Sequence, residues 1–66
     1  MQKVEIGQHY REESARSIIW IVAEEAPRSG SIRHLRILKL NDPTTIKLIS
    51  DRALADKKLY RLIDLH

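Results

Sequence analysis

The stretch IRHLRILKLNDPTTIKLIS, residues 32–50, decides the fold. Its two halves, residues 32–40 and 44–50, are rich in isoleucine, leucine and threonine, and their apolar positions partly alternate with polar ones, as in half-buried strands. Between the halves, asparagine and aspartate side chains can bond their own backbone and proline fixes φ, so Asn41–Pro43 has the chemistry of a turn. We therefore expect a β-hairpin over residues 32–50.

A second apolar run precedes the hairpin and contains the single tryptophan. Within residues 17–26, five apolar side chains follow one another from Ile18 to Val22. Apolar residues on both faces of an extended chain indicate a central strand, so we expect Trp20 to belong to the core. Farther upstream, residues 4–14 are typical of a short strand with a turn before it, because Gly7 interrupts the pattern.

Residues 51–65 fit two structures. On a helix, their apolar side chains fall within about half of the circumference, and Ser50 or Asp51 could cap the start. Alternatively, residues 50–56 form one helical turn and residues 59–64 form a closing strand, with Tyr60 and Leu62 facing inward. A final strand that pairs near the first would close a small barrel and reduce the exposed edges of the sheet.

The order of these elements resembles that of a known class of small domain. The pattern GQHY, IIWIV, RHLRI, DPTTIKLIS, AL.D and LYRLID is similar to short uncharacterised bacterial proteins with an SH3-like barrel. The resemblance spans most of the chain and implies a mostly β fold, a single small SH3-like barrel of about five strands over residues 1–66. The alternative is an α+β fold, an antiparallel sheet with a C-terminal amphipathic helix over residues 51–65. SH3-like barrels serve in RNA binding, peptide binding and assembly, so the resemblance selects no function.

The composition argues against several classes of function. The chain has no cysteine, its two glycines fit no phosphate-binding loop, and its serines lie in no nucleophile motif. Its three histidines lack the spacing of a metal site. We therefore expect no catalytic residue, no metal, no cofactor and no enzyme. No apolar run approaches the roughly 20 residues of a membrane span, and the N-terminus lacks the apolar region of a signal peptide, so we expect a cytoplasmic protein without a membrane partner.

Positive charge gathers in one segment. Residues 26–41 contain no acid and four cations, Arg28, Arg33, Arg36 and Lys39. Arginine forks and counterion release favour binding to phosphates. These four residues are therefore the candidate site for nucleic acid or another polyanion.

The direction of the arginines depends on the regularity of the strand. A bulge near Arg36 or Ile37 would direct Leu35, Leu38 and Leu40 toward the core. The arginines of the strand would then point outward, where a phosphate backbone can reach them.

The alternative function is a protein-interaction or self-assembly module. Its contact with a protein partner or a second copy would be the exposed part of residues 18–22 or residues 59–65. Salt separates the two hypotheses, since phosphate binding weakens steeply as salt rises whereas an apolar contact hardly responds.

Overall fold

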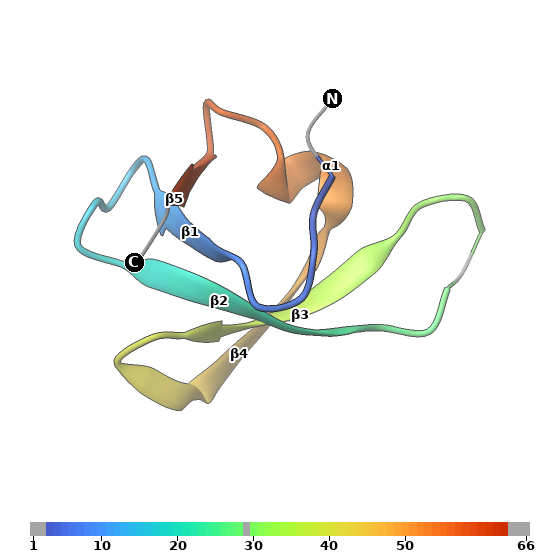
Figure 1. Ribbon diagram of the computed structural model, residues 1–66, viewed down its shortest axis with the longest axis horizontal. Coiled ribbons are helices and arrows are strands. Elements are labelled where there is room, and N and C mark those ends of the chain that lie inside the picture. Colours follow the sequence, from blue (N-terminus) through green and yellow to red (C-terminus); the bar gives the residue numbers. More distant parts are fainter. Residues whose placement is uncertain (1–2, 29, 64–66) are drawn as a thin grey trace.

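The computed structural model describes residues 3–28 and 30–63, which form five strands and one helical turn (Figure 1). The elements are β1 (His9–Glu12), β2 (Ile19–Glu25), β3 (His34–Lys39), β4 (Asp42–Ser50), α1 (Asp51–Leu54) and β5 (Tyr60–Ile63). The strands make one antiparallel sheet in the order β4-β3-β2-β1-β5. The expected mostly β fold with about five strands is confirmed.

β3 and β4 form the expected hairpin, but its turn lies earlier than predicted. Lys39 pairs with Asp42, so the turn residues are Leu40 and Asn41. Asp42 and Pro43 already belong to β4, and the predicted turn at Asn41–Pro43 is wrong.

A bulge in β4 explains this difference. The pair that precedes Lys39 and Asp42 joins Leu38 to Ile46, which leaves residues 43–45 extra on β4. The Asp42 carboxylate accepts hydrogen bonds from the hydroxyls of the two threonines in this bulge. The turn-forming residues therefore stabilise the bulge, where the ladder is interrupted and proline, which has no N–H to donate, is tolerated.

β3 is regular where the sequence predicted a bulge, near Arg36. Its pairing with β4 is uninterrupted across this point, and the shift in its pairing with β2 falls within β2. Simple alternation therefore holds, and Leu35 and Ile37 are both fully buried. Leu38 is half-buried and Leu40 is exposed, so the prediction that both face the core is wrong.

The core covers one face of the curled sheet, here called the inner face. β2 is the middle strand, as expected, and Trp20 is buried at 6% exposure, which confirms its prediction as a core residue. The core consists of Val4, Tyr10, Trp20, Val22, Leu35, Ile37, Leu54 and Tyr60.

The chain enters β1 through the expected turn. Gly7 has a φ of +93°, a conformation that other residues adopt only with strain. Its N–H donates to the carbonyl of Val22 at 2.8 Å, which fixes the N-terminal segment against β2. The segment thereby brings Val4 into the core.

The C-terminal segment forms one helical turn and a final strand, as predicted, rather than the long helix, but among the described residues this strand does not close the sheet into a barrel. The Ser50 hydroxyl caps α1 by accepting from the Ala53 N–H at 3.1 Å, but the helix has only four residues. The Asp56 carboxylate then accepts from the Lys58 N–H, a local bond that competes with helix continuation. The predicted helix over residues 51–65 is therefore wrong, although its last two residues, like the last of the predicted strand, lie outside the described part of the chain.

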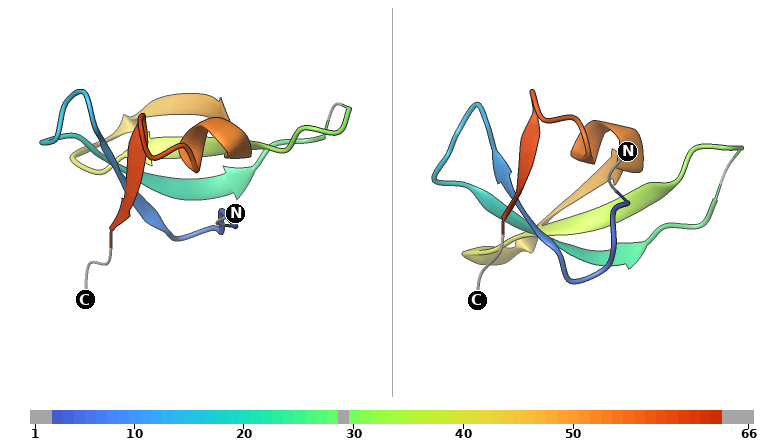
Figure 2. Two further views of the ribbon diagram at one scale, coloured as in Figure 1. Left: turned by 90° about the horizontal axis from the view of Figure 1, so that it is seen from above. Right: turned by 45° about the horizontal axis from the view of Figure 1, so that its top comes forward.

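β5 pairs with β1 and places Tyr60 in the core, as predicted. Leu62, which was also predicted to face inward, is 43% exposed. Within the described residues the sheet is not closed, because β4 and β5 are its two edges. Figure 2 shows how strongly the sheet curls, with the chain crossing from one edge to the other through α1.

Candidate interaction surface

The four cations of the basic segment do not form one cluster. Arg33 lies at the rim of the inner face, where its side chain is 16% exposed. Its guanidinium donates to Glu25 at 2.8 Å and to the carbonyl of Val4 at 2.6 Å. Arg28 lies 3.9 Å from the same Glu25 carboxylate. These two arginines therefore share one acid at the end of β2.

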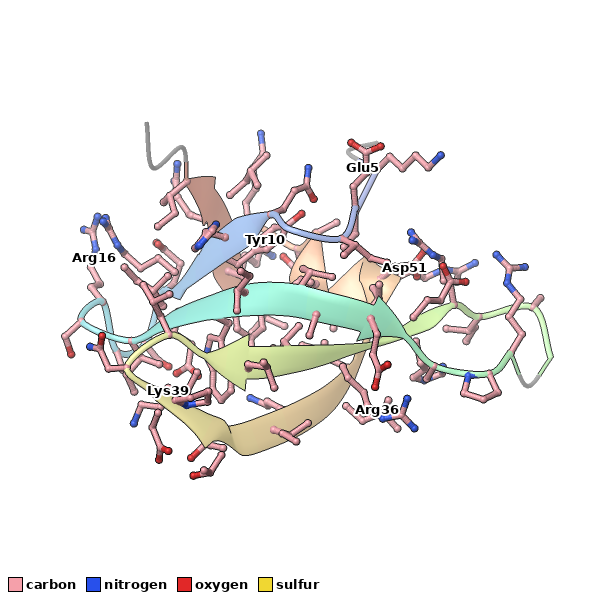
Figure 3. The ribbon with its side chains drawn as sticks, turned by 60° about the horizontal axis from the view of Figure 1, so that its bottom comes forward. Glu5, Tyr10, Arg16, Arg36, Lys39 and Asp51 are labelled. Atoms are coloured by element: carbon pink, nitrogen blue, oxygen red, sulfur yellow. The ribbon has the colours of Figure 1, made fainter. Side chains whose placement is uncertain are left out.

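The other two cations lie apart from this pair and from each other. Arg36 points to the opposite, outer face of the sheet and contacts Glu24 at 3.4 Å. Lys39 lies at the far end of β3, near the turn (Figure 3). Hydrogen bonds from Thr44 and Thr45 lower the pKa of Asp42, and the charge of Lys39 adds a smaller effect in the same direction.

Three of the candidate cations, Arg28, Arg33 and Arg36, thus have a carboxylate within 3.9 Å, although residues 26–41 contain none. The acids come from the neighbouring strand, since Glu24 and Glu25 end β2 and lie opposite Arg36 and Leu35 of β3. Antiparallel pairing of the two runs was the signal that could have predicted this neutralisation. The exposed ion pairs of Arg28 and Arg36 contribute little to stability, but the acids lower the positive potential of the surface.

A second charged site, which the sequence analysis did not single out, lies on the inner face between the two edges. Lys47 of β4 donates to the Tyr60 hydroxyl of β5 at 2.9 Å. Its ammonium also lies 5.4 Å from the centre of the Trp20 ring and 5.6 Å from that of Tyr60, within the range of cation–π attraction. Glu12 lies 4.0 Å from the ammonium and accepts from the Trp20 indole N–H at 2.8 Å.

This arrangement keeps Lys47 charged. The hydrogen bond to Tyr60 raises the pKa of the amine, and Glu12 adds to the effect, while partial burial opposes it. A lysine that acts as a base or a nucleophile needs the opposite, a lowered pKa. Lys47 is therefore suited to bind and to stabilise, not to transfer protons near neutral pH.

The groove around Lys47 is small and mixed in character. Its volume is about 240 Å³. It is lined by Glu12, Ser14, Lys47, Ile49, Ala53, Leu59 and Tyr60. No group of three or more potential metal ligands occurs among residues 3–28 and 30–63.

The outer face carries a row of mostly apolar side chains across all five strands. The register places Ile63, His9, Ile21, Leu38 and Ile46 side by side, one from each strand. Most members of this row are half-buried by their neighbours. The row becomes most exposed where it reaches β4.

β4 turns two of its three large apolar residues away from the core. Ile46 and Leu48 lie on the outer face at 60% and 59% exposure, whereas Lys47 and Ile49 face inward. Two large aliphatic side chains on an edge strand are the most exposed apolar feature of the described sheet. The alternation of β4 was visible in the sequence, but the bulge at residues 43–45 and the position of the helical turn decide which face is buried.

The fold and this surface define a small, mostly β domain with an open antiparallel sheet and an apolar edge. No protein-family model, no curated protein and no solved structure matches the chain. No helix in the described residues is long and apolar enough to cross a membrane.

Proposed function

We propose that this chain is a small non-catalytic binding module, a protein-interaction domain that takes an extended segment of a partner along β4. The observation that carries the proposal is the exposure of Ile46 and Leu48 on an edge strand. Full burial of an isoleucine or leucine side chain stabilises by roughly 1.5–3 kcal/mol relative to exposure. A partner that covers both residues gains part of that energy.

The backbone of an edge strand supports the same function. Its outward N–H and C=O groups can pair with an added strand, which provides main-chain hydrogen bonds while side chains provide specificity. β4 is a nine-residue strand, the longest of the sheet, and the exposed pair lies at its regular part.

Photo-cross-linking in the cells that produce the chain tests this function. A photoreactive residue at position 48 is expected to yield one discrete cross-linked species, and Ile46→Lys is expected to remove it. The control position is Ile6, which is equally exposed at 62% but lies in the N-terminal turn, off the sheet. Equal yields from positions 48 and 6, or no product from position 48, would contradict the proposal.

Nucleic-acid binding by Arg28, Arg33, Arg36 and Lys39 stays a prediction. The side chain of Arg36, which is 41% exposed on the outer face, is the feature that favours it. The carboxylates beside three of the four cations reduce their attraction for phosphate. Salt distinguishes the two functions, because an apolar strand contact persists at salt concentrations that abolish phosphate binding.

A further inference from the structure

We infer that the partner of β4 is a second copy of this chain, paired antiparallel with its own β4 across a two-fold axis at Leu48. The inference rests on the proposed function and names its occupant. Three features of β4 support it: the direction of its backbone groups, the position of its one central charge, and its self-complementary register.

The direction of the backbone groups follows from a hydrogen bond just before the start of β3. The Asp51 N–H donates to the Arg33 carbonyl at 2.9 Å, so Asp51 faces β3. Backbone groups alternate in direction along an antiparallel strand. The backbone N–H and C=O groups of Ile49 and Lys47 therefore also point toward β3. Those of residues 46, 48 and 50 point away from the sheet. The donors and acceptors of Ile46 and Leu48 and the N–H of Ser50 are available to another strand, whereas the Ser50 carbonyl, at the N-cap of α1, accepts the first hydrogen bond of the helix.

Natural sheets commonly protect an exposed edge with a charged side chain, most often lysine. Between Asp42 and Asp51, β4 has one charged residue, Lys47. Its ammonium is held on the inner face by Tyr60 and Glu12. The charge that could repel a second copy is thus engaged within the same chain, and the outer face of this edge presents Ile46 and Leu48.

The length of the regular part of β4 determines the register. The bulge ends before Ile46, and α1 begins after Ser50, which leaves residues 46–50 for a straight ladder. A two-fold axis at the midpoint, Leu48, uses all five residues. Leu48 then meets its own copy, Ile46 meets Ser50, and Lys47 meets Ile49.

Neighbouring registers are less favourable. An axis at Lys47 would oppose two lysines directly, and like charges in that position are destabilising. An axis at Ile46 would require the bulge of one copy to pair with residues 47–50 of the other. An axis at Ile49 would retain only three paired residues. The Leu48 register is therefore the one that pairs all five regular residues of β4 and opposes no like charges.

A contact of five residues per strand is smaller than a standard protein interface, so we expect a weak dimer. Small domains without disulfides commonly gain stability by association, and the described part of this chain leaves seven large apolar side chains exposed. Sedimentation of the purified chain up to about 1 mM covers the affinities expected for such a contact.

Complementary charges at position 48 provide the decisive test. Leu48→Lys and Leu48→Glu should each weaken dimerisation at least tenfold, because identical charges then meet on the axis. An equimolar mixture of the two variants should recover the dimer as a heterodimer. Recovery by mixing requires position 48 to face itself, so it identifies the two-fold register. Ile6→Lys, at a similarly exposed apolar site, should sediment like wild type.

The outcomes separate this inference from the proposed function. A monomer at all concentrations, together with a discrete foreign species cross-linked from position 48, overturns the inference and keeps the proposed function. A monomer with no such species overturns both. Open-ended or ring-like oligomers, insensitive to mixing of the two charge variants, would overturn the two-fold register and indicate head-to-tail pairing of β4 with β5.

Discussion

Lys47 and Tyr60 join the two edges of the open sheet through a single 2.9 Å hydrogen bond. Lys47 lies on β4 and Tyr60 on β5, strands that are separated by three others in the sheet. The contact is also backed by the Trp20 ring, so it links the edges to the core.

Removal of the hydroxyl of Tyr60 tests this link. Tyr60→Phe keeps the buried ring but deletes the acceptor of the Lys47 hydrogen bond, at an expected loss of roughly 0.5–1.5 kcal/mol in the free energy of unfolding. The value should fall near the lower limit, because the Lys47 side chain is 44% exposed and water can replace the lost acceptor. Urea unfolding of both proteins measures the difference, and an unchanged midpoint would show that the bond does not contribute.

The raised pKa of Lys47 predicts a loss of stability in alkali. Because the folded chain holds this proton more tightly than the unfolded chain, the stabilisation is complete below the ordinary lysine value of 10.5 and is lost as the pH rises through the higher folded value. The difference in stability between wild type and Lys47→Met should therefore shrink between about pH 9 and pH 12. Thermal melting of both proteins across this range checks it. A difference that stays constant or grows would contradict the raised pKa.

Trp20 is predicted to be essential for folding. Trp20→Ala removes a buried ring at a cost of roughly 3–5 kcal/mol and leaves the Glu12 carboxylate without its indole donor. A domain of 66 residues has little stability to lose, so the variant should be largely unfolded at ambient temperature by circular dichroism. A variant that melts like wild type would refute the role of Trp20 in the core.

Arg11 and Arg61 are predicted to repel each other. They are directly paired across β1 and β5, and the Nε of Arg11 is buried without a hydrogen-bond partner. Arg61 has a weak contact with Glu13 at 3.7 Å. A double-mutant cycle with Arg11→Thr and Arg61→Thr should yield an unfavourable coupling energy of about 0.2–1 kcal/mol for the native pair. The coupling should diminish at high salt, and a favourable sign would refute the prediction.

Removal of the acids beside the basic segment tests nucleic-acid binding. Glu24→Gln together with Glu25→Gln should free Arg28 and Arg36, whereas Arg33 stays bonded to the Val4 carbonyl. The salt dependence of binding to a mixed-sequence oligonucleotide should steepen by about one unit per freed contact. Glu5→Gln removes one negative charge in the N-terminal turn. It is the matched control for Glu24→Gln and for Glu25→Gln when each is made alone. Fluorescence anisotropy at low salt measures the affinities. If neither wild type nor the double variant binds, the segment is not a polyanion site.

The sequence predicted the elements of this fold better than their faces. Turn chemistry and two apolar runs were enough for the hairpin, and the five-residue apolar run placed Trp20 in the middle strand. Alternation in β4 places Ile46 and Leu48 on one face and Lys47 on the other, but it does not predict which of the two faces is buried. That choice depends on a bulge held by Asp42 and on the start of α1, which are features of the assembled hairpin.

The candidate site was less accessible to sequence analysis, for a related reason. A charge count along the chain treats Arg33 and Arg36 as unopposed, whereas their acids arrive from β2. Likewise, Glu12 follows Arg11 in sequence but points to the inner face, toward Trp20 and Lys47. In a strand, neighbours in sequence point to opposite faces, so electrostatic partners are found across strands and not along them.

The self-contained hairpin tip suggests where this chain can change length. Residues 42–45 are held together by hydrogen bonds among themselves. The Asp42 carboxylate accepts from the backbone N–H and the hydroxyl of Thr44 and from the hydroxyl of Thr45. The bulge separates this tip from the regular ladder that begins at Ile46. Insertions or grafted peptides placed after Leu40, whose own N–H donates to the Ile19 carbonyl at 2.8 Å, should therefore be tolerated, because the tip can be rebuilt without shifting the register of the strands behind it.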